Sequence, residues 1–185
     1  MLGKSATAVR YRAVVARRLR YAAMERLWAP WRLQFVKSAS DENEIECVFC
    51  AKQGADDREA LVVHRGARCF VMLNLYPYTN GHLMVAPHRH VAKPGDLDAE
   101  ERAELWELLA QSLAALDLTL KPHGANAGLN LGRPAGAGVE GHLHLHVVPR
   151  WNGDVNFMPV LADVRVMAQH LDDTWQVLRD AWGSV

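Results

Sequence analysis

Three histidines alternate with aliphatic residues in one short stretch, and no other feature of the chain constrains its local structure as strongly. The histidines are His142, His144 and His146, within residues 141–151. The aliphatic residues that separate and follow them are Leu143, Leu145 and Val147. Side chains of a β-strand point alternately to its two faces, so a strand would gather the imidazoles on one face, whereas a helix would scatter them. We therefore predict a strand that carries three imidazoles on one face.

Three imidazoles on one face suit two kinds of chemistry. They can ligate a metal ion, or they can serve a phosphate as nucleophile, proton donor and charge stabiliser. The alternative is a strand whose polar face is rich in histidine without a chemical role. Nine histidines among 185 residues seldom place three on one face by chance. We therefore expect a chemical site here.

Length, composition and charge narrow the class of protein. A hydrophobic content of 50% over 185 residues is enough for one ordinary core, and no apolar run reaches the roughly 18 residues that span a bilayer. Six of the 21 basic residues and none of the 21 acidic residues fall within residues 1–23, which leaves the rest with a net charge of −6. A compact domain of that charge lacks the basic face of a general nucleic-acid binder. We expect neither a nucleic-acid partner nor a membrane partner.

Residues 1–23 differ from the rest of the chain, because they are basic, rich in alanine and free of acid. Transit peptides have this composition, and a true start at Met24 would leave the same kind of upstream segment. In both cases we predict a disordered extension over residues 1–23 and one domain over residues 24–185.

The chain has three cysteines, too few and too unevenly spaced for a disulfide framework, which indicates a reducing, cytoplasmic setting. Cys47-x-x-Cys50 by itself is a weak signal, shared by zinc sites, redox sites and chance. Zinc would need two further ligands from elsewhere in the chain. Cys69 falls within a predicted strand, where we expect a buried and inert thiol.

Turn signals and hydrophobic periodicity outline the other elements. We predict a hairpin from strands over residues 61–64 and 67–73, further strands over residues 82–87 and 128–132, and helices over residues 98–117 and 163–182. Asp98 and Glu101 form a capping box that opens the first helix. Small residues fill residues 134–139, where backbone N–H groups could form a nest for anionic oxygens just before the histidines.

Several motifs occur in an order that resembles the histidine triad (HIT) superfamily of nucleotide hydrolases and transferases. They are His142-x-His144-x-His146-Val147-Val148-Pro149-Arg150, Gly81-His82-Leu83-Met84-Val85-Ala86-Pro87 with Asn74 eight residues before His82, and Asn130 with the small-residue loop. Trp28-Ala29-Pro30-Trp31-Arg32, Cys47-x-x-Cys50 and residues 149–157 are similar to the bacterial branch of diadenosine tetraphosphate phosphorylases and hydrolases. The resemblance covers residues 28–160. It implies an α+β fold with a five-stranded antiparallel sheet and packed helices, assembled as a homodimer, with association beyond the dimer left open.

The resemblance also implies a role for each histidine. His144 would attack the α-phosphorus of a dinucleoside polyphosphate through Nε2 and form a nucleotidyl-histidine intermediate, with His142 supporting it. His146 and His82 would donate to phosphate oxygens. The implied substrate-binding positions are Asn74 at the ribose, Asn130 on the phosphate side, and the backbone N–H groups of Gly136, Ala137, Gly138 and Val139 at charge that develops in the transition state.

By the same resemblance, some bacterial relatives bind zinc through positions that match Cys47, Cys50, His90 and His142. Two thiolates and two imidazoles complete a tetrahedral site with no open position, which is typical of a structural metal. The competing role for His142 is to orient its neighbours. The chemistry at the phosphate is expected to need no metal.

Two departures from the family pattern bear on the activity. Uridylyltransferase relatives have glutamine in place of the third histidine, so His146 argues against that branch. Relatives assigned as phosphorylases carry Gly-Ser where this chain has Ala137-Gly138, and the missing hydroxyl favours water over inorganic phosphate as the acceptor. Phosphorolysis stays the alternative. Two further alternatives are a metallohydrolase whose triad histidines hold one catalytic metal, and a nucleotide sensor without turnover.

Overall fold

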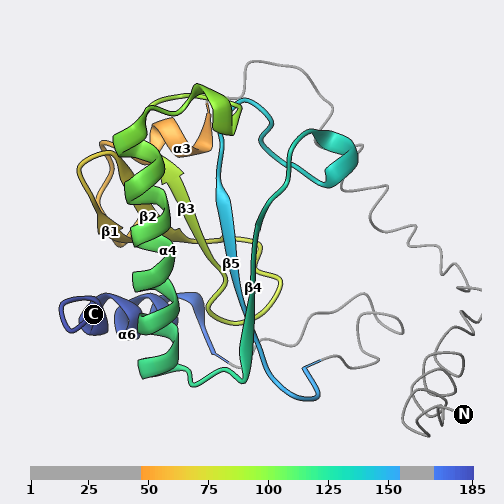
Figure 1. The fold of residues 1–185 in the computed structure, drawn as a ribbon. Helices are drawn as coiled ribbons and strands as arrows, with labels where there is room; N and C mark the ends of the chain where they lie inside the picture. The colour runs from red at the N-terminus through yellow and green to blue at the C-terminus, as the bar shows by residue number, and fades with distance from the viewer. Residues whose placement is uncertain (1–46, 155–168) are drawn as a thin grey trace, which may run out of the picture. The chain divides into compact units, whose positions relative to one another are not determined.

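The computed structural model describes residues 47–154 and 169–185. Within them, five strands form one antiparallel sheet, as predicted, and their order is β1-β2-β3-β5-β4 (Figure 1). The strands are β1 Val62–Arg65, β2 Cys69–Leu73, β3 Leu83–Pro87, β4 Gly124–Leu129 and β5 Leu145–Arg150. The predictions for residues 1–23, for a domain boundary at Met24 and for residues 28–32 lie outside the described residues.

Alternate residues of the central strands enter two separate apolar clusters, one on each face of the sheet. In β2, Cys69, Val71 and Leu73 join the larger cluster, while Phe70 and Met72 join the smaller one. The same alternation continues in β3. The strand period of two therefore divides the central strands between two cores, and both of their faces are buried.

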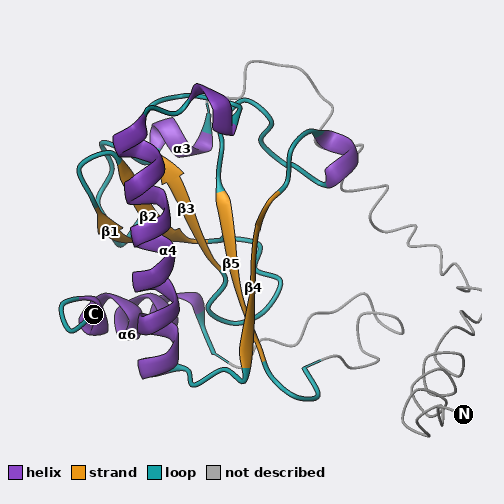
Figure 2. Ribbon diagram, in the orientation of Figure 1, coloured by secondary structure: helices purple, strands orange, loops and turns teal. Residues whose placement is uncertain are grey.

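Two helices cover the larger cluster (Figure 2). The helix α4, Ala99–Thr119, begins with the predicted capping box and packs across β2, β3 and β5. The helix α6, Leu171–Trp182, packs on α4 and β1, and Trp175 Nε1 donates to the Val62 carbonyl at 2.9 Å. None of the described helices is long and apolar enough to cross a membrane.

The smaller cluster lies under the short helix α3, Val48–Ala51. Its Phe49 is only 2% exposed and contacts Phe70 of β2. Cys47 and Cys50 flank Phe49 in the sequence, so the burial of this one ring also holds both thiols against the sheet. Two 3-10 helices, η1 Pro94–Asp96 and η2 Arg133–Ala135, complete the regular elements of the described chain.

The strand that carries the histidines begins later than predicted. β5 pairs with its neighbours only from Leu145 onward, so His142 and His144 precede it. The reason is a bond outside the ladder, because the Leu143 N–H donates to the Val91 carbonyl at 2.6 Å. This contact ties the chain before β5 to the loop that follows β3.

Two other predicted bounds differ from the structure. The predicted strand over residues 128–132 is β4, which starts at Gly124 and ends at Leu129, because Gly132 turns with φ 79° into η2. In the described chain α6 begins at Leu171, since the preceding His170 has extended backbone angles. Residues 163–168 of the predicted helix lie outside the described part.

Gly81 delivers the chain to β3 and to His82. Its φ is 78°, and a Cβ at this position would lie 2.5 Å from Leu120 and 3.1 Å from Leu116. Glycine provides both the left-handed conformation and the room beside the end of α4. The turn thereby fixes where His82 enters the sheet.

Candidate active site

The triad histidines lie on the sheet face that carries α3, opposite the aliphatic residues between them. Those aliphatic residues enter the larger cluster: Leu143, Leu145 and Val147. His142, His144 and His146 are 1%, 7% and 9% exposed. The alternation therefore separates the two sets as predicted, although strand pairing begins only at Leu145.

His144 is held with its Nε2 lone pair available. Its Nδ1 lies 2.8 Å from the carbonyl oxygen of His142. Because a carbonyl oxygen only accepts, Nδ1 carries the proton and donates, which leaves the lone pair on Nε2. Phe49 stacks on the ring with centroids 4.8 Å apart. Burial lowers the pKa of His144, against the opposing effect of the carbonyl, so the ring is neutral at neutral pH.

His82 and His146 form a pair beside His144. His82 Nε2 lies 3.0 Å from His146 Nδ1, and the rings of His146 and His144 meet edge to face. Burial, with His144 adding to it, lowers the pKa of His146 to about 4. On its other side, His146 Nε2 lies 3.3 Å from Asn130 Nδ2. His82 thus faces His146, and its direct donation to a phosphate oxygen stays a prediction.

The loop before β3 surrounds His82. Asn74 Nδ2 lies 3.4 Å from His82 Nδ1, and the Tyr78 N–H donates to the same nitrogen at 3.1 Å. The Tyr78 ring also packs on His82, with centroids 4.6 Å apart. Asn74 therefore lies at the histidines, and the ribose contact that the resemblance implies for it stays a prediction.

Four predicted ligands converge beside α3 and could hold a metal ion. The ligand atoms of Cys47, Cys50, His90 and His142 all lie within 4.8 Å of one another. His142 Nδ1 lies 3.3 Å from Cys47 Sγ, and His90 Nδ1 lies 3.3 Å from Cys50 Sγ. Zn–S bonds of about 2.3 Å and Zn–N bonds of about 2.0 Å separate tetrahedral ligand atoms by roughly 3.3–3.8 Å. The donor types fit tetrahedral zinc, and so do these two distances.

His142 presents Nδ1 to the thiols because its other ring nitrogen is engaged. His142 Nε2 donates to the Pro87 carbonyl at 2.9 Å, which leaves the lone pair on Nδ1. Burial lowers the pKa of His142, with the Pro87 carbonyl opposing this effect. His142 Nδ1 faces the cysteines while His144 Nδ1 faces a carbonyl, so the triad imidazoles do not converge on one point. This geometry argues against a metallohydrolase in which all three hold one metal.

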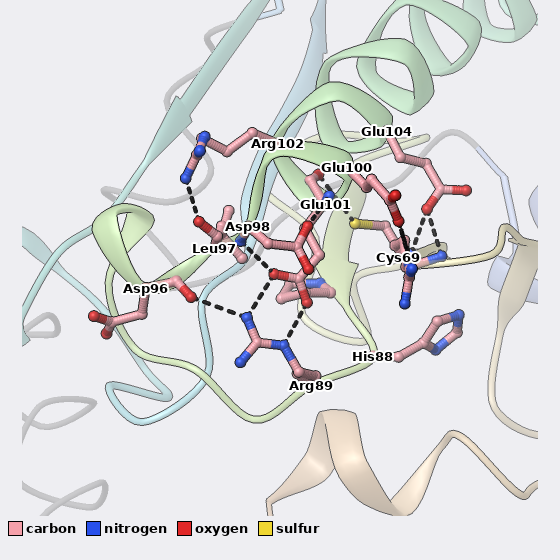
Figure 3. A network of polar contacts seen from close by, with 12 residues as sticks. Cys69, His88, Arg89, Asp96, Leu97, Asp98, Glu100, Glu101, Arg102 and Glu104 are labelled. Carbon is pink, nitrogen blue, oxygen red and sulfur yellow. Dashed lines mark hydrogen bonds and ion pairs between the residues drawn. The ribbon is translucent and has the colours of Figure 1, made fainter.

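An ion pair between the exposed Arg89 and the buried Glu101 holds the loop that follows Pro87 and carries His90 (Figure 3). Arg89 Nε and Nη2 lie 2.6 and 2.7 Å from the two carboxylate oxygens of Glu101. Glu101 is only 2% exposed, and its hydrogen bonds to Arg89 hold its pKa at about 2. The same carboxylate accepts the Asp98 N–H in the capping box. The start of α4 therefore fixes the position of this loop.

Glu104, one turn further along α4, holds the neighbouring β1–β2 turn (Figure 3). Its carboxylate accepts three successive backbone N–H groups, those of Ala67, Arg68 and Cys69. His88 joins this turn to the loop, since its N–H donates to the Arg68 carbonyl at 2.8 Å and its Nε2 donates to the Gly66 carbonyl at 3.0 Å. Glu101 thus supports the segment before His90 directly through Arg89, and Glu104 supports it indirectly through the β1–β2 turn that contacts His88.

The small-residue loop is only partly open to an anion. The Gly136 N–H donates to the Arg133 carbonyl at 2.9 Å, and the Ala137 N–H donates to the Gly132 carbonyl at 3.2 Å. Within residues 47–154 and 169–185, the N–H groups of Gly138 and Val139 make no such bond. A nest for anionic oxygens would therefore rest on these two groups.

Three supporting residues were not singled out by the sequence, namely Phe49, Tyr78 and Arg89, and Glu101 was singled out only as part of the capping box. They act on the histidines by ring packing, through a backbone N–H or through an ion pair. Only two signals pointed toward them. Phe49 lies inside Cys47-x-x-Cys50, and Arg89 immediately precedes His90.

Comparison with known proteins extends this picture. The HIT domain family matches residues 56–153. An AP-4-A phosphorylase of Mycobacterium tuberculosis (strain ATCC 25618 / H37Rv) is 39% identical over 165 residues, which cover 86% of this chain and 85% of that protein. A bis(5'-adenosyl)-triphosphatase of Dictyostelium discoideum is 33% identical over 81 residues, which cover 44% of this chain and 54% of that protein.

The fold is also similar to that of a solved histidine triad structure. A Zn-bound histidine triad family protein from Mycobacterium smegmatis has a TM-score of 0.61 and 28% sequence identity, covering 75% of this chain and 94% of that chain. The family match spans the sheet and all the site histidines but not α3 with Cys47 and Cys50, and the match to the M. tuberculosis relative extends over most of the chain. The chain therefore belongs to the HIT domain family of histidine triad proteins.

Proposed function

We propose that this protein cleaves dinucleoside polyphosphates of the diadenosine tetraphosphate type by transferring a nucleotidyl group first to His144 and then to water. One observation carries the proposal: the His142 carbonyl fixes the His144 proton on Nδ1, so a neutral imidazole offers Nε2 as nucleophile. The substrate class is supported by the names of two relatives, an AP-4-A phosphorylase and a bis(5'-adenosyl)-triphosphatase.

The proposed reaction has two displacements at one phosphorus. In the first, His144 Nε2 forms a bond to the α-phosphorus, and the bridging P–O bond breaks with its electron pair leaving on the nucleoside polyphosphate. In the second, water attacks the same phosphorus, the P–N electron pair returns to Nε2, and a water proton is released. The N–H groups of Gly138 and Val139 would stabilise charge on the phosphate oxygens. Diadenosine tetraphosphate would give AMP and ATP.

Inorganic phosphate is the second candidate acceptor of the nucleotidyl group. One set of observations favours water, and another observation favours phosphate. Ala137 and Gly138 offer no hydroxyl to an incoming phosphate, and the Ala137 N–H is used within the loop. These features favour water. The 39% identity to an AP-4-A phosphorylase over 86% of the chain favours phosphate. Phosphorolysis would give ADP and ATP from the same substrate.

The proposal includes a structural zinc ion held by Cys47, Cys50, His90 and His142. The mixed thiol and imidazole donors and their mutual distances support it, as does the Zn-bound relative from M. smegmatis. With four protein ligands, no coordination position remains for water or substrate. Zinc would supply charge for the thiolates and a fixed geometry for His142, while the phosphate chemistry would belong to His144.

The proposal also includes a homodimer. β4 is the last strand of the sheet, pairs with β5 along one edge and has mostly exposed residues. An exposed edge strand readily pairs with another chain. Light scattering after gel filtration would measure the mass in solution, and a monomer at the concentrations of the activity assay would contradict this part of the proposal.

Product analysis tests the reaction itself. Diadenosine tetraphosphate is incubated with the protein in the presence and absence of inorganic phosphate, and acid quenching traps labelled protein. AMP and ATP in both conditions would establish hydrolysis, whereas ADP and ATP only with phosphate would establish phosphorolysis. His144→Ala should abolish both turnover and covalent label. Turnover that survives in His144→Ala would overturn the mechanism, and nucleotide binding without turnover by the wild type would favour the sensor.

A further inference from the structure

We propose that Asn74 is a positioning residue which, together with the Tyr78 N–H, fixes the tautomer of His82 and through it directs the proton of His146 to Nε2. This inference rests on the proposed nucleotidyl transfer, because it describes how one donor to the phosphate is prepared. It assigns the Asn74 amide a task separate from a ribose contact.

The orientation of the Asn74 amide is fixed from its own loop. Its Oδ1 accepts the Tyr76 N–H at 2.9 Å. A backbone N–H can only donate, so the oxygen must face Tyr76 and the amino group must face the other way. The amino group is the part of Asn74 that lies 3.4 Å from His82 Nδ1.

His82 Nδ1 is therefore surrounded by donors. The Tyr78 N–H donates to it at 3.1 Å, and the Asn74 amino group approaches the same atom. Two donors on one ring nitrogen require that nitrogen to hold the lone pair, so the proton of a neutral His82 lies on Nε2. That Nε2–H then donates to His146 Nδ1 across 3.0 Å.

The tautomer of His146 follows from its hydrogen-bond partners in the same way. Its Nδ1 accepts from His82, so its own proton lies on Nε2. Asn130 Nδ2 lies 3.3 Å from His146 Nε2, which would place two donors against each other. A half-turn of the Asn130 amide exchanges nitrogen for oxygen and removes the conflict, whereas the Tyr78 backbone N–H has no such freedom. The hydrogen bonds at His82, and not the one at Asn130, therefore determine the tautomer of His146.

A neutral His146 that carries its proton on Nε2 is suited to one task. It can donate a hydrogen bond to a phosphate oxygen without losing the proton, because a further loss would leave an imidazolate anion. Such a bond strengthens as negative charge builds up in the transition state. The opposite tautomer would present a lone pair to the phosphate and repel it.

The tautomers can be measured without any turnover. Long-range proton–nitrogen correlation NMR of protein labelled with ¹⁵N-histidine distinguishes protonated from unprotonated ring nitrogens. For the wild type we expect protonated Nε2 and unprotonated Nδ1 in His82 and His146, and the reverse in His144. A protonated Nδ1 in His146 would overturn the inference, while leaving His144 as nucleophile untouched.

Asn74→Asp is the decisive variant, because it exchanges the amino group for an oxygen and retains an oxygen for the Tyr76 N–H. The new acceptor should compete with the Tyr78 N–H for His82 Nδ1, draw the proton of His82 to that nitrogen and so end the bond from His82 Nε2 to His146. We expect kcat to fall on the order of 100-fold, the effect of losing one donor to a developing oxyanion. Loss of a ribose contact alone would raise KM and leave the tautomers unchanged.

Asn152→Asp is the matched control, with the same change of amide to carboxylate. Asn152 lies in the turn after β5 and is exposed, and its backbone N–H donates to His123 Nδ1 at 2.9 Å, a contact that the substitution leaves in place. This variant should keep wild-type tautomers and kcat. If Asn74→Asp also keeps the wild-type tautomers of His82 and His146, Asn74 does not set them and the inference fails. If wild-type protein shows the expected tautomers but no nucleotidyl transfer, the proposed function fails separately.

Discussion

The Nδ1 atom of His144 lies 2.8 Å from the carbonyl oxygen of His142, and the ring of that same His142 belongs to the four-residue metal group. One residue therefore serves two sites: its backbone fixes the tautomer of His144, the proposed nucleophile, and its side chain faces the cysteines. Phe49 adds a second connection, because it stacks on His144 and also contacts His142. The geometry of the metal group and of the nucleophile should therefore depend on each other.

Loss of the metal should slow the reaction without changing its products. Cys50→Ser removes one ligand, so His142 loses a partner that holds its ring and, through it, its carbonyl. We expect metal affinity to fall because a direct ligand is lost, and kcat to fall by about 10–100-fold, the usual effect of disturbing residues that support a site. Metal content by atomic emission would be measured beside kcat. Chelated wild type should recover when zinc is added back, and full kcat in metal-free protein would contradict the dependence.

Glu101→Gln should weaken the metal site from a distance. The neutral amide cannot form the two charged bonds to Arg89, so the loop that carries His90 would lose its anchor on α4. We expect metal affinity to fall by about tenfold, measured by competition with a chromophoric chelator and by the visible absorption of the cobalt-substituted protein.

Glu100→Gln is the control for that measurement. Glu100 lies on the same turn of α4 as Glu101 and pairs with Arg68, but the Glu100 side chain is 70% exposed. Exposed ion pairs contribute little, so this variant should bind metal as the wild type does. Equal affinities in Glu101→Gln and wild type would show that the Arg89 pair does not support His90.

The face on which the histidines lie was predictable because strand alternation is a local property of the sequence. Leu143 and Leu145 reach the larger core, and His144 reaches the opposite face, as a period of two requires. The start of β5 was not predictable in the same way. It depends on the bond from the Leu143 N–H to the Val91 carbonyl, which forms only after the chain has folded back.

The same division between local and non-local signals holds for the supporting residues. The capping box of Asp98 and Glu101 is a pattern within one helix turn, and the structure confirms it. The ion pair of Glu101 with Arg89 joins two elements, and no sequence period announces it. His90 entered the predicted metal group through the family resemblance, since its own loop position carries no pattern.

Phe49 should matter for stability and for catalysis in ways that two substitutions separate. Phe49→Ala leaves a cavity in the smaller cluster and should cost about 3–5 kcal/mol of unfolding free energy. Phe49→Leu retains more apolar volume and should cost less, but it also removes the ring that stacks on His144. Urea unfolding and kcat would be measured for both variants. Wild-type kcat in Phe49→Leu would show that the stacked ring does not orient the nucleophile.

Stability should fall as the pH drops below neutrality, and His146 should account for part of the loss. Burial, with His144 adding to it, lowers the pKa of His146 to about 4, against roughly 6.5 for an exposed histidine. Between these values the unfolded chain binds a proton that the folded protein does not, so acid favours unfolding. The unfolding free energy that depends on a neutral His146 is fully present above about pH 6.5. It falls by up to about 1.4 kcal/mol per pH unit below that value, and the loss levels off near pH 4.

His146→Asn isolates this contribution from that of the other buried histidines. Among the residues that the structure describes, those in contact with His146 are His82, His144, Asn130 and the Tyr78 ring, and none of these is an acid that would stabilise a charged imidazolium. Urea unfolding of both proteins across the range from about pH 4 to pH 7 should show a shallower loss of stability in the variant, by up to one proton's worth of slope. Because burial also lowers the pKa of His142 and His144, some acid sensitivity should persist in His146→Asn. Parallel curves for the two proteins would mean that His146 titrates alike in the folded and unfolded states.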